Sequence, residues 1–118
     1  MKENVVKIKS FNFALRIVRC CKFLQEDRKE FVLSKQLLRS GTAIGALIRE
    51  SEHAESNADF IHKLLISLKE ANETEYWIEL LFRADYIDEQ SYLSLNSDID
   101  ELLKLLVSIV KTSKKKIN

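Results

Sequence analysis

Two histidines and the acidic side chains around them are the residues of this chain best suited to chemistry. His53 and His62 lie in a segment rich in carboxylates, namely Glu50, Glu52, Glu55 and Asp59. Histidine and carboxylate side chains bind metals and transfer protons, but neither the zinc spacing H-E-x-x-H nor a cysteine-based zinc motif occurs. We therefore interpret this cluster as a charged surface and predict neither a metal nor a cofactor.

A second candidate is the pair formed by Arg49 and His53. All-α ribonucleases of the HEPN type use an arginine and a histidine with four to six residues between them. Here three residues intervene, and no P-loop, glycine-rich phosphate loop or nucleophile motif occurs elsewhere. We therefore predict that the protein is not an enzyme, and a HEPN-like nuclease is the third-ranked alternative.

The two cysteines, Cys20 and Cys21, are adjacent on a predicted helix. Neighbouring side chains on a helix point about 100° apart, which disfavours a disulfide between them. The first ten residues, MKENVVKIKS, lack the apolar core of a secretory signal, and no apolar run approaches the ~20 residues that span a bilayer. These features predict a cytoplasmic protein with reduced thiols and no membrane contact.

The elements that carry these residues are predicted to be helices. The 118 residues include no proline and two glycines, and 46% of them are hydrophobic, which favours one domain. Apolar residues recur at three- and four-residue spacing in four segments, at about 10–25, 29–53, 57–84 and 88–113, and a basic tail follows at 111–118. Short corners make successive helices antiparallel. Residues 1–118 are therefore predicted to form an all-α, antiparallel, up-down-up-down four-helix bundle.

The first predicted helix is apolar on nearly every side. Its polar stripe separates one apolar side, with Phe11, Leu15 and Val18, from a second apolar side. A surface helix of a single bundle needs one apolar face of about 100°. We therefore predict that the second side faces another subunit of a homo-oligomer, through Phe13, Ile17, Cys20 and Leu24.

The middle of the second predicted helix has very little side-chain bulk. Gly41 and Gly45 stand there among serine, threonine and alanine residues. A glycine inside a helix costs about 1 kcal/mol relative to alanine, so a compensating contact is expected. We predict that another helix packs closely against this small-residue patch, and we favour this over a ligand pocket.

A polar network is predicted between the second and third helices. In an antiparallel pair that turns near Glu55, residues whose numbers sum to roughly 110 lie at the same level. This rule brings together Gln36, Arg39, Glu70 and Glu73. A guanidinium between two carboxylates can fix helix register, so the predicted role is structural rather than catalytic.

Charge is segregated along the sequence although the net charge is +1. Residues 1–49 hold eleven Lys or Arg against four Asp or Glu, and residues 50–110 hold four against fourteen. The last eight residues add four lysines, which are the candidate contacts for nucleic acid: Lys111, Lys114, Lys115 and Lys116. The simpler interpretation is a solvated basic end that neighbouring carboxylates partly neutralise.

Two strings give the chain a family resemblance. The second segment contains QLLRSGTAIGALIRES and the third contains DFIHKLLISLKEANETEYWIELL. In this order they resemble the four-helix-bundle proteins encoded by intervening sequences of bacterial 23S ribosomal RNA genes. The resemblance implies a cytoplasmic homo-oligomer, a ring-shaped pentamer, without assigned enzymatic activity. A related branch comprises the accessory proteins of diversity-generating retroelements, in which a basic bundle engages nucleic acid and a reverse transcriptase.

The favoured function is a non-enzymatic, self-assembling scaffold or interaction module. The alternative is an RNA- or DNA-binding accessory protein, for example the partner of a reverse transcriptase, with weak nucleic-acid binding. Salt-dependent retention of RNA distinguishes these two hypotheses.

Overall fold

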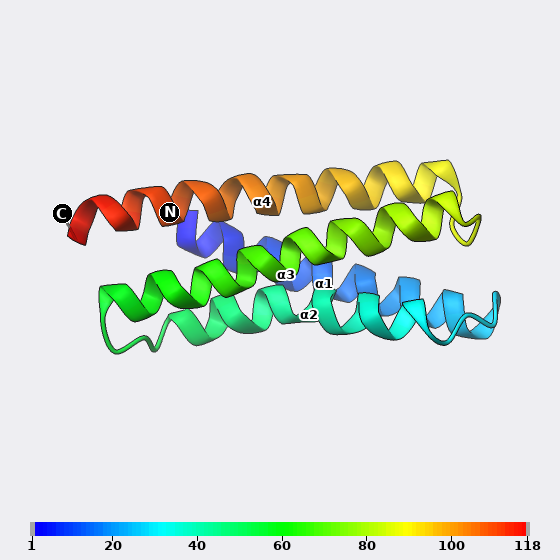
Figure 1. The fold of residues 1–118 in the computed structure, drawn as a ribbon, viewed down its shortest axis with the longest axis horizontal. Coiled ribbons are helices and arrows are strands. Elements are labelled where there is room, and N and C mark those ends of the chain that lie inside the picture. Colours follow the sequence, from blue (N-terminus) through cyan, green and yellow to red (C-terminus); the bar gives the residue numbers. More distant parts are fainter. Residues whose placement is uncertain (1, 118) are drawn as a thin grey trace.

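A computed structural model describes residues 2–117, which form four helices. These are α1 (Lys2–Glu26), α2 (Leu33–Ser51), α3 (Asn57–Arg83) and α4 (Glu89–Ile117). The helices run alternately up and down, and both ends of the chain lie at the same end of the bundle (Figure 1). Both α1 and α3 pack against α2 and α4, so α1 and α3 occupy opposite corners. The predicted all-α, antiparallel, up-down-up-down four-helix bundle is confirmed.

The helix bounds differ from the predicted ones at three places. Helix α1 begins at Lys2 rather than near residue 10, because Val6 and Ser10 continue the buried side of the helix toward the N-terminus. Helix α4 continues to Ile117, so the predicted basic tail is helical as far as this residue, and Asn118 lies outside the described residues. Helix α2 begins at Leu33 rather than at residue 29.

The corner before α2 explains its late start. Lys29 has a φ of 54°, which turns the chain out of α1. The buried carboxylate of Glu30 then accepts hydrogen bonds from the backbone N–H groups of Val32, Leu33 and Ser34, at 3.2, 3.0 and 2.7 Å. These are N–H groups that a helix start leaves without an intrahelical partner. A side chain upstream of the helix therefore caps α2.

The core contains the side of α1 that the sequence assigned to another subunit. Phe13, Ile17 and Leu24 are at most 2% exposed, and Cys20 is partly buried at the edge of the core. The predicted oligomer interface is therefore wrong. Both apolar sides of α1 have similar helical spacing, and the periodicity alone does not determine which of them faces inward.

The small-residue patch on α2 is packed against α1 inside the bundle. A Cβ atom on Gly41 would lie 2.9 Å from both Cγ1 and Cγ2 of Ile17. A Cβ atom on Gly45 would lie 3.3 Å from Oγ of Ser10 and 3.4 Å from its backbone carbonyl. The prediction of a closely packed helix is confirmed, and α1 is that helix.

Within residues 2–117, no helix is both long and apolar enough to cross a membrane. The same residues contain no group of three or more His, Cys, Asp or Glu side chains arranged to hold a metal ion.

Candidate functional site

The outward side of α1 carries a line of exposed apolar side chains. Ile8 is 62% exposed, Phe11 50%, Leu15 40% and Val18 48%. Their spacing of three or four residues places them on one side of the helix. Single exposed apolar residues are common on protein surfaces, whereas a contiguous set marks an interaction surface. We call these four residues the outer stripe.

A groove between α1 and α2 adjoins the outer stripe at Phe11. It has a volume of about 590 Å³, and the small residues Ala14, Thr42, Gly45 and Ala46 contribute to its lining. The lack of bulk that lets α1 approach α2 also leaves this groove open. Phe11 belongs both to the groove and to the outer stripe, so the two features form one continuous surface.

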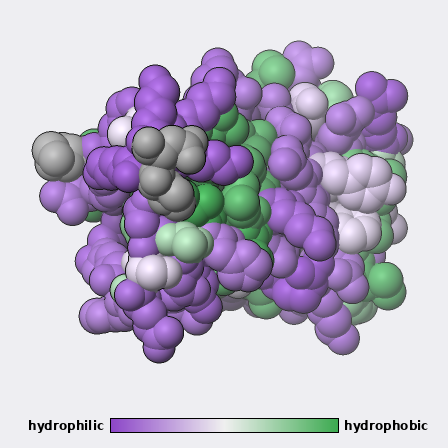
Figure 2. All heavy atoms as spheres, turned by 60° about the vertical axis from the view of Figure 1, so that its left-hand side comes forward, coloured by the Kyte–Doolittle hydropathy of each residue, from purple (hydrophilic) through white to green (hydrophobic). Residues whose placement is uncertain are grey.

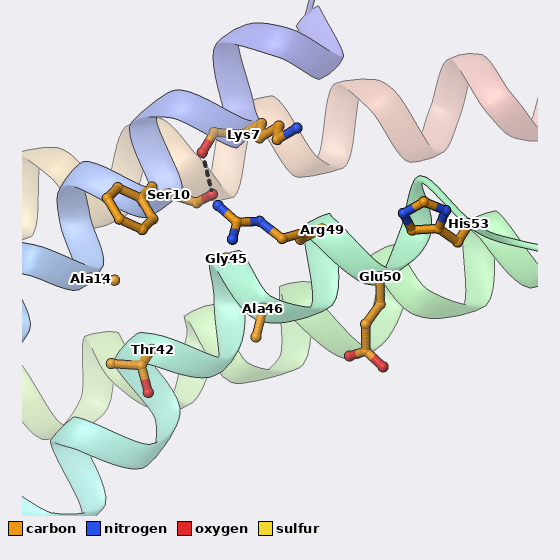
Figure 3. A pocket seen from close by; sticks show the side chains of 10 residues that line it. Lys7, Ser10, Ala14, Thr42, Gly45, Ala46, Arg49, Glu50 and His53 are labelled. Atoms are coloured by element: carbon orange, nitrogen blue, oxygen red, sulfur yellow. Dashed lines mark hydrogen bonds between the residues drawn. The ribbon is translucent and has the colours of Figure 1, made fainter.

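Charged side chains surround this groove. In Figure 3, Arg49 extends from α2 toward α1, whereas the Glu50 side chain, which also lines the groove, points away from α1. The guanidinium carbon of Arg49 lies 5.7 Å from the centroid of the Phe11 ring, within cation–π range. Lys7 Nζ is 2.8 Å from Oε1 of Glu52. A hydrogen bond from Lys7 lowers the pKa of the Glu52 carboxyl.

The hydroxyl groups at the groove are not arranged as nucleophiles. Ser10 Oγ donates a hydrogen bond to the carbonyl of Lys7 at 3.1 Å, and Thr42 Oγ1 donates to the carbonyl of Leu38 at 2.7 Å. An activated nucleophile needs a hydrogen bond to a base instead. His53 lines the groove beside Arg49, but these hydroxyls are used by the helix backbone.

The two cysteines are free thiols whose pKa values are raised. Burial raises the pKa of Cys20. The pKa of Cys21 is raised to about 12, mainly by burial and to a smaller extent by the neighbouring Cys20 and Glu30. The thiolate is the reactive form of cysteine, so these pKa shifts disfavour nucleophilic or redox chemistry at either residue.

The predicted polar network is present between α2 and α3. Arg39 donates from Nη1 to Oε1 of Glu70 at 3.1 Å, from Nη2 to Oε2 of Glu73, and from Nε to Oε1 of Gln36 at 3.3 Å. Trp77 Nε1 also donates to Glu73, at 3.0 Å. The Arg39 side chain is 49% exposed, so the network lies at the surface rather than in the core. Its predicted register role remains a prediction.

The lysine-rich end of α4 lies beside the start of α1 and the corner between α2 and α3. Lys2 Nζ donates to Ser108 Oγ at 2.5 Å, and Asn57 Nδ2 donates to the carbonyl of Ser113 at 2.9 Å. Figure 2 looks toward this end and shows a largely hydrophilic surface, with some hydrophobic side chains visible among the hydrophilic ones. The four candidate residues are exposed and form no ion pair within the described chain: Lys111, Lys114, Lys115 and Lys116.

Comparison with known proteins identifies a family and a very similar solved structure. The model of a family described as 23S rRNA-intervening sequence protein matches residues 2–108. A crystal structure of a protein with unknown function from the S23 ribosomal protein family of Bacteroides thetaiotaomicron is 64% identical, with a TM-score of 0.93. The match covers 94% of this chain and 99% of that chain. No curated protein matches.

Proposed function

The chain belongs to the 23S rRNA-intervening sequence protein family, and from this premise we propose that it is a non-enzymatic, self-associating scaffold or interaction module. In this proposal it works in the cytoplasm as a homo-oligomer, and the family resemblance implies a ring of five. The outer stripe on α1 is the surface through which copies associate.

The exposure of the outer stripe is the observation that carries this proposal. Ile8, Phe11, Leu15 and Val18 are each between 40% and 62% exposed. Full burial of such a side chain contributes about 1.5–3 kcal/mol, so completing the burial of one of these residues contributes roughly half as much. Several such gains along one helix favour a contact that removes the stripe from water.

The chemistry of the groove supports a non-enzymatic role. The hydroxyls of Ser10 and Thr42 donate to backbone carbonyls. Outside the groove, burial raises the pKa of the two thiols, Cys20 and Cys21. The side chains that border the groove are therefore better suited to contact with a partner than to bond making.

Light scattering of the purified protein and a stripe variant tests the proposal. We expect the natural chain to be a stable oligomer at micromolar concentration. Leu15→Gln with Val18→Gln should shift it to monomers with unchanged helix content, because two apolar contacts become polar. Leu65→Gln on α3 with Val32→Gln at the corner before α2 is the control for a general loss of exposed apolar residues. A monomeric natural chain, or equal mass for the natural and stripe-variant proteins, contradicts the proposal.

An RNA- or DNA-binding accessory role, for example beside a reverse transcriptase, is the second candidate. The observation that favours it is the set of four exposed lysines in the last two turns of α4. Lysines bind phosphate as point charges, and a ring would repeat a weak contact several times. The salt dependence of RNA binding tests this candidate.

A further inference from the structure

We infer that copies of this chain join head to tail, with the outer stripe on α1 of one copy packed against the outer face of α4 of the next copy. This inference rests on the proposed function and names the second surface that self-association requires. The occupant of the outer stripe is therefore a second copy of this chain, in contact through a different helix.

Charge disfavours the simplest alternative, in which two α1 stripes face each other. Arg19 and Lys22 are exposed next to the stripe, and neither forms an ion pair within residues 2–117. A contact between two α1 helices would bring these cations together, which opposes association. Residues 84–103 contain six Asp or Glu and no Lys or Arg. The start of α4 therefore offers the opposite charge.

Contacts inside the bundle define which residues of α1 and α4 lie at the same level. Lys9 pairs with Glu101 at 3.2 Å, and Arg16 Nη2 donates to Ser94 Oγ at 2.9 Å. The residue numbers add to 110 in both pairs. In a ring whose axis runs along the bundle, rotation keeps every copy at the same height. The same rule therefore aligns α1 of one copy with α4 of the next.

Apolar side chains meet at two of these levels. Leu93, which is 56% exposed on α4, is level with Leu15 and Val18 of the outer stripe. Val107, which is 37% exposed, is level with Val5, which is 38% exposed. These matches let each apolar side chain leave water against another apolar side chain.

Between the levels of Leu93 and Val107, the surface of α4 has a hollow. Nearer the start of α4, Glu89 provides a carboxylate. The hollow has a volume of about 450 Å³ and is lined by Ser97, Asp100, Glu101, Lys104 and Leu105. It lies at the level of Ile8 and Phe11, the two most exposed residues of the outer stripe. Glu89 at the start of α4 is level with Lys22. The protruding Ile8 and Phe11 thus lie opposite a hollow in which Leu105 is the apolar lining residue, and Lys22 lies opposite Glu89.

The positions of the two helices make such a contact close on itself. Because α1 and α4 pack directly together, they occupy adjacent corners of the bundle. Adjacent corners of a square point about 90° apart, near the interior angles of rings of four or five copies, about 90° and 108°. A contact between α1 and α3, at opposite corners, would instead extend into an open filament.

Cross-linking between differently substituted copies tests the inference. Both copies carry Cys20→Ala and Cys21→Ala, so the natural thiols do not interfere. One copy then carries Val18→Cys and the other Leu93→Cys, and the two are co-expressed with different tags and oxidised. We expect a disulfide-linked dimer that contains both tags as the main product. The control replaces Leu93→Cys by Tyr76→Cys, on α3, where Tyr76 is 59% exposed.

Each outcome of this experiment has a definite meaning. A dimer with both tags from the Val18→Cys and Leu93→Cys pair, with little product in the control, supports the inference. Cross-linking of the Val18→Cys copy to itself, or of Val18→Cys to Tyr76→Cys, overturns it. No cross-link in an oligomer of normal mass also overturns it, while the proposed function stands. A monomer by light scattering contradicts the proposed function itself.

Discussion

Glu30 shows how one side chain can determine where a helix begins. It is 8% exposed, and its carboxylate accepts hydrogen bonds from three backbone N–H groups at the start of α2. Burial by itself raises the pKa of this carboxyl. The hydrogen bonds from Leu33, Ser34 and Val32 outweigh burial and lower its pKa below the usual value.

We predict that Glu30→Gln lowers the free energy of unfolding at neutral pH by about 0.5–2 kcal/mol, the range of a lost helix cap. A carboxyl with a lowered pKa stabilises the fold at pH values above its unfolded-state pKa. This contribution is lost as the pH falls through the folded-state pKa. Urea unfolding at a series of pH values should therefore show the two proteins converging in acid. A difference that is constant with pH would contradict this account of Glu30.

The network around Arg39 is expected to contribute less to stability than the Glu30 cap. Its side chain is 49% exposed, and surface ion pairs contribute about 0–1 kcal/mol. We predict that Arg39→Met changes the free energy of unfolding by less than about 1 kcal/mol, as measured by urea unfolding. Glu73→Gln is the variant for comparison, because it removes the charge that pairs with Arg39 and also disturbs the hydrogen bond from Trp77. A loss near the 3–5 kcal/mol of a broken buried pair would show that the network is shielded from water.

At the scale of elements, the close approach of α1 and α2 depends on glycine. A Cβ atom at Gly41 would overlap the side chain of Ile17, which is fully buried. We predict that Gly41→Ala lowers the free energy of unfolding by about 1–3 kcal/mol, the typical cost of overpacking. Ile17→Ala removes both Cγ atoms that this Cβ would meet. The double variant should therefore lose less stability in thermal unfolding than the sum of the two single variants, with Ile17→Ala alone as the control. Strictly additive effects would mean that the two residues do not compete for space.

The elements also show what the sequence could and could not predict. Helical spacing predicted all four helices, and the level rule for antiparallel helices predicted the contact of Arg39 with Glu70 and Glu73. The inward side of α1 was predicted wrongly, because Phe13 and Ile17 have the same spacing as Phe11 and Leu15. The start of α2 was missed because it depends on Glu30, whose burial is a property of the folded chain.

The folded structure, rather than the sequence, shows which apolar side of α1 becomes the outer stripe. Gly41 and Gly45 require a partner helix close to α2, and the α1 residues that fill this space are Ser10 and Ile17. Ile17 lies on the same side of α1 as Phe13 and Leu24, so this side must face inward. The remaining apolar side is then the exposed one.

At the scale of the whole molecule, the bundle gathers the basic ends of the sequence in one place. The start of α1 lies beside the lysine-rich end of α4 (Figure 1). Binding to single-stranded RNA falls with salt with a slope of about 0.7 per phosphate contacted. We predict weak binding whose slope flattens in a variant with Lys114→Gln, Lys115→Gln and Lys116→Gln, measured by fluorescence anisotropy. Submicromolar affinity at physiological salt, lost in this variant, would favour the nucleic-acid role over the scaffold role.

The mass of the natural protein in solution tests the central claim most directly. The claim is that the outer stripe on α1 is covered by another copy of the chain. Sedimentation equilibrium at micromolar concentration should give a single species whose mass is a small whole multiple of the 13.7 kDa chain. An ideal single species of 13.7 kDa across the whole concentration range would contradict the claim.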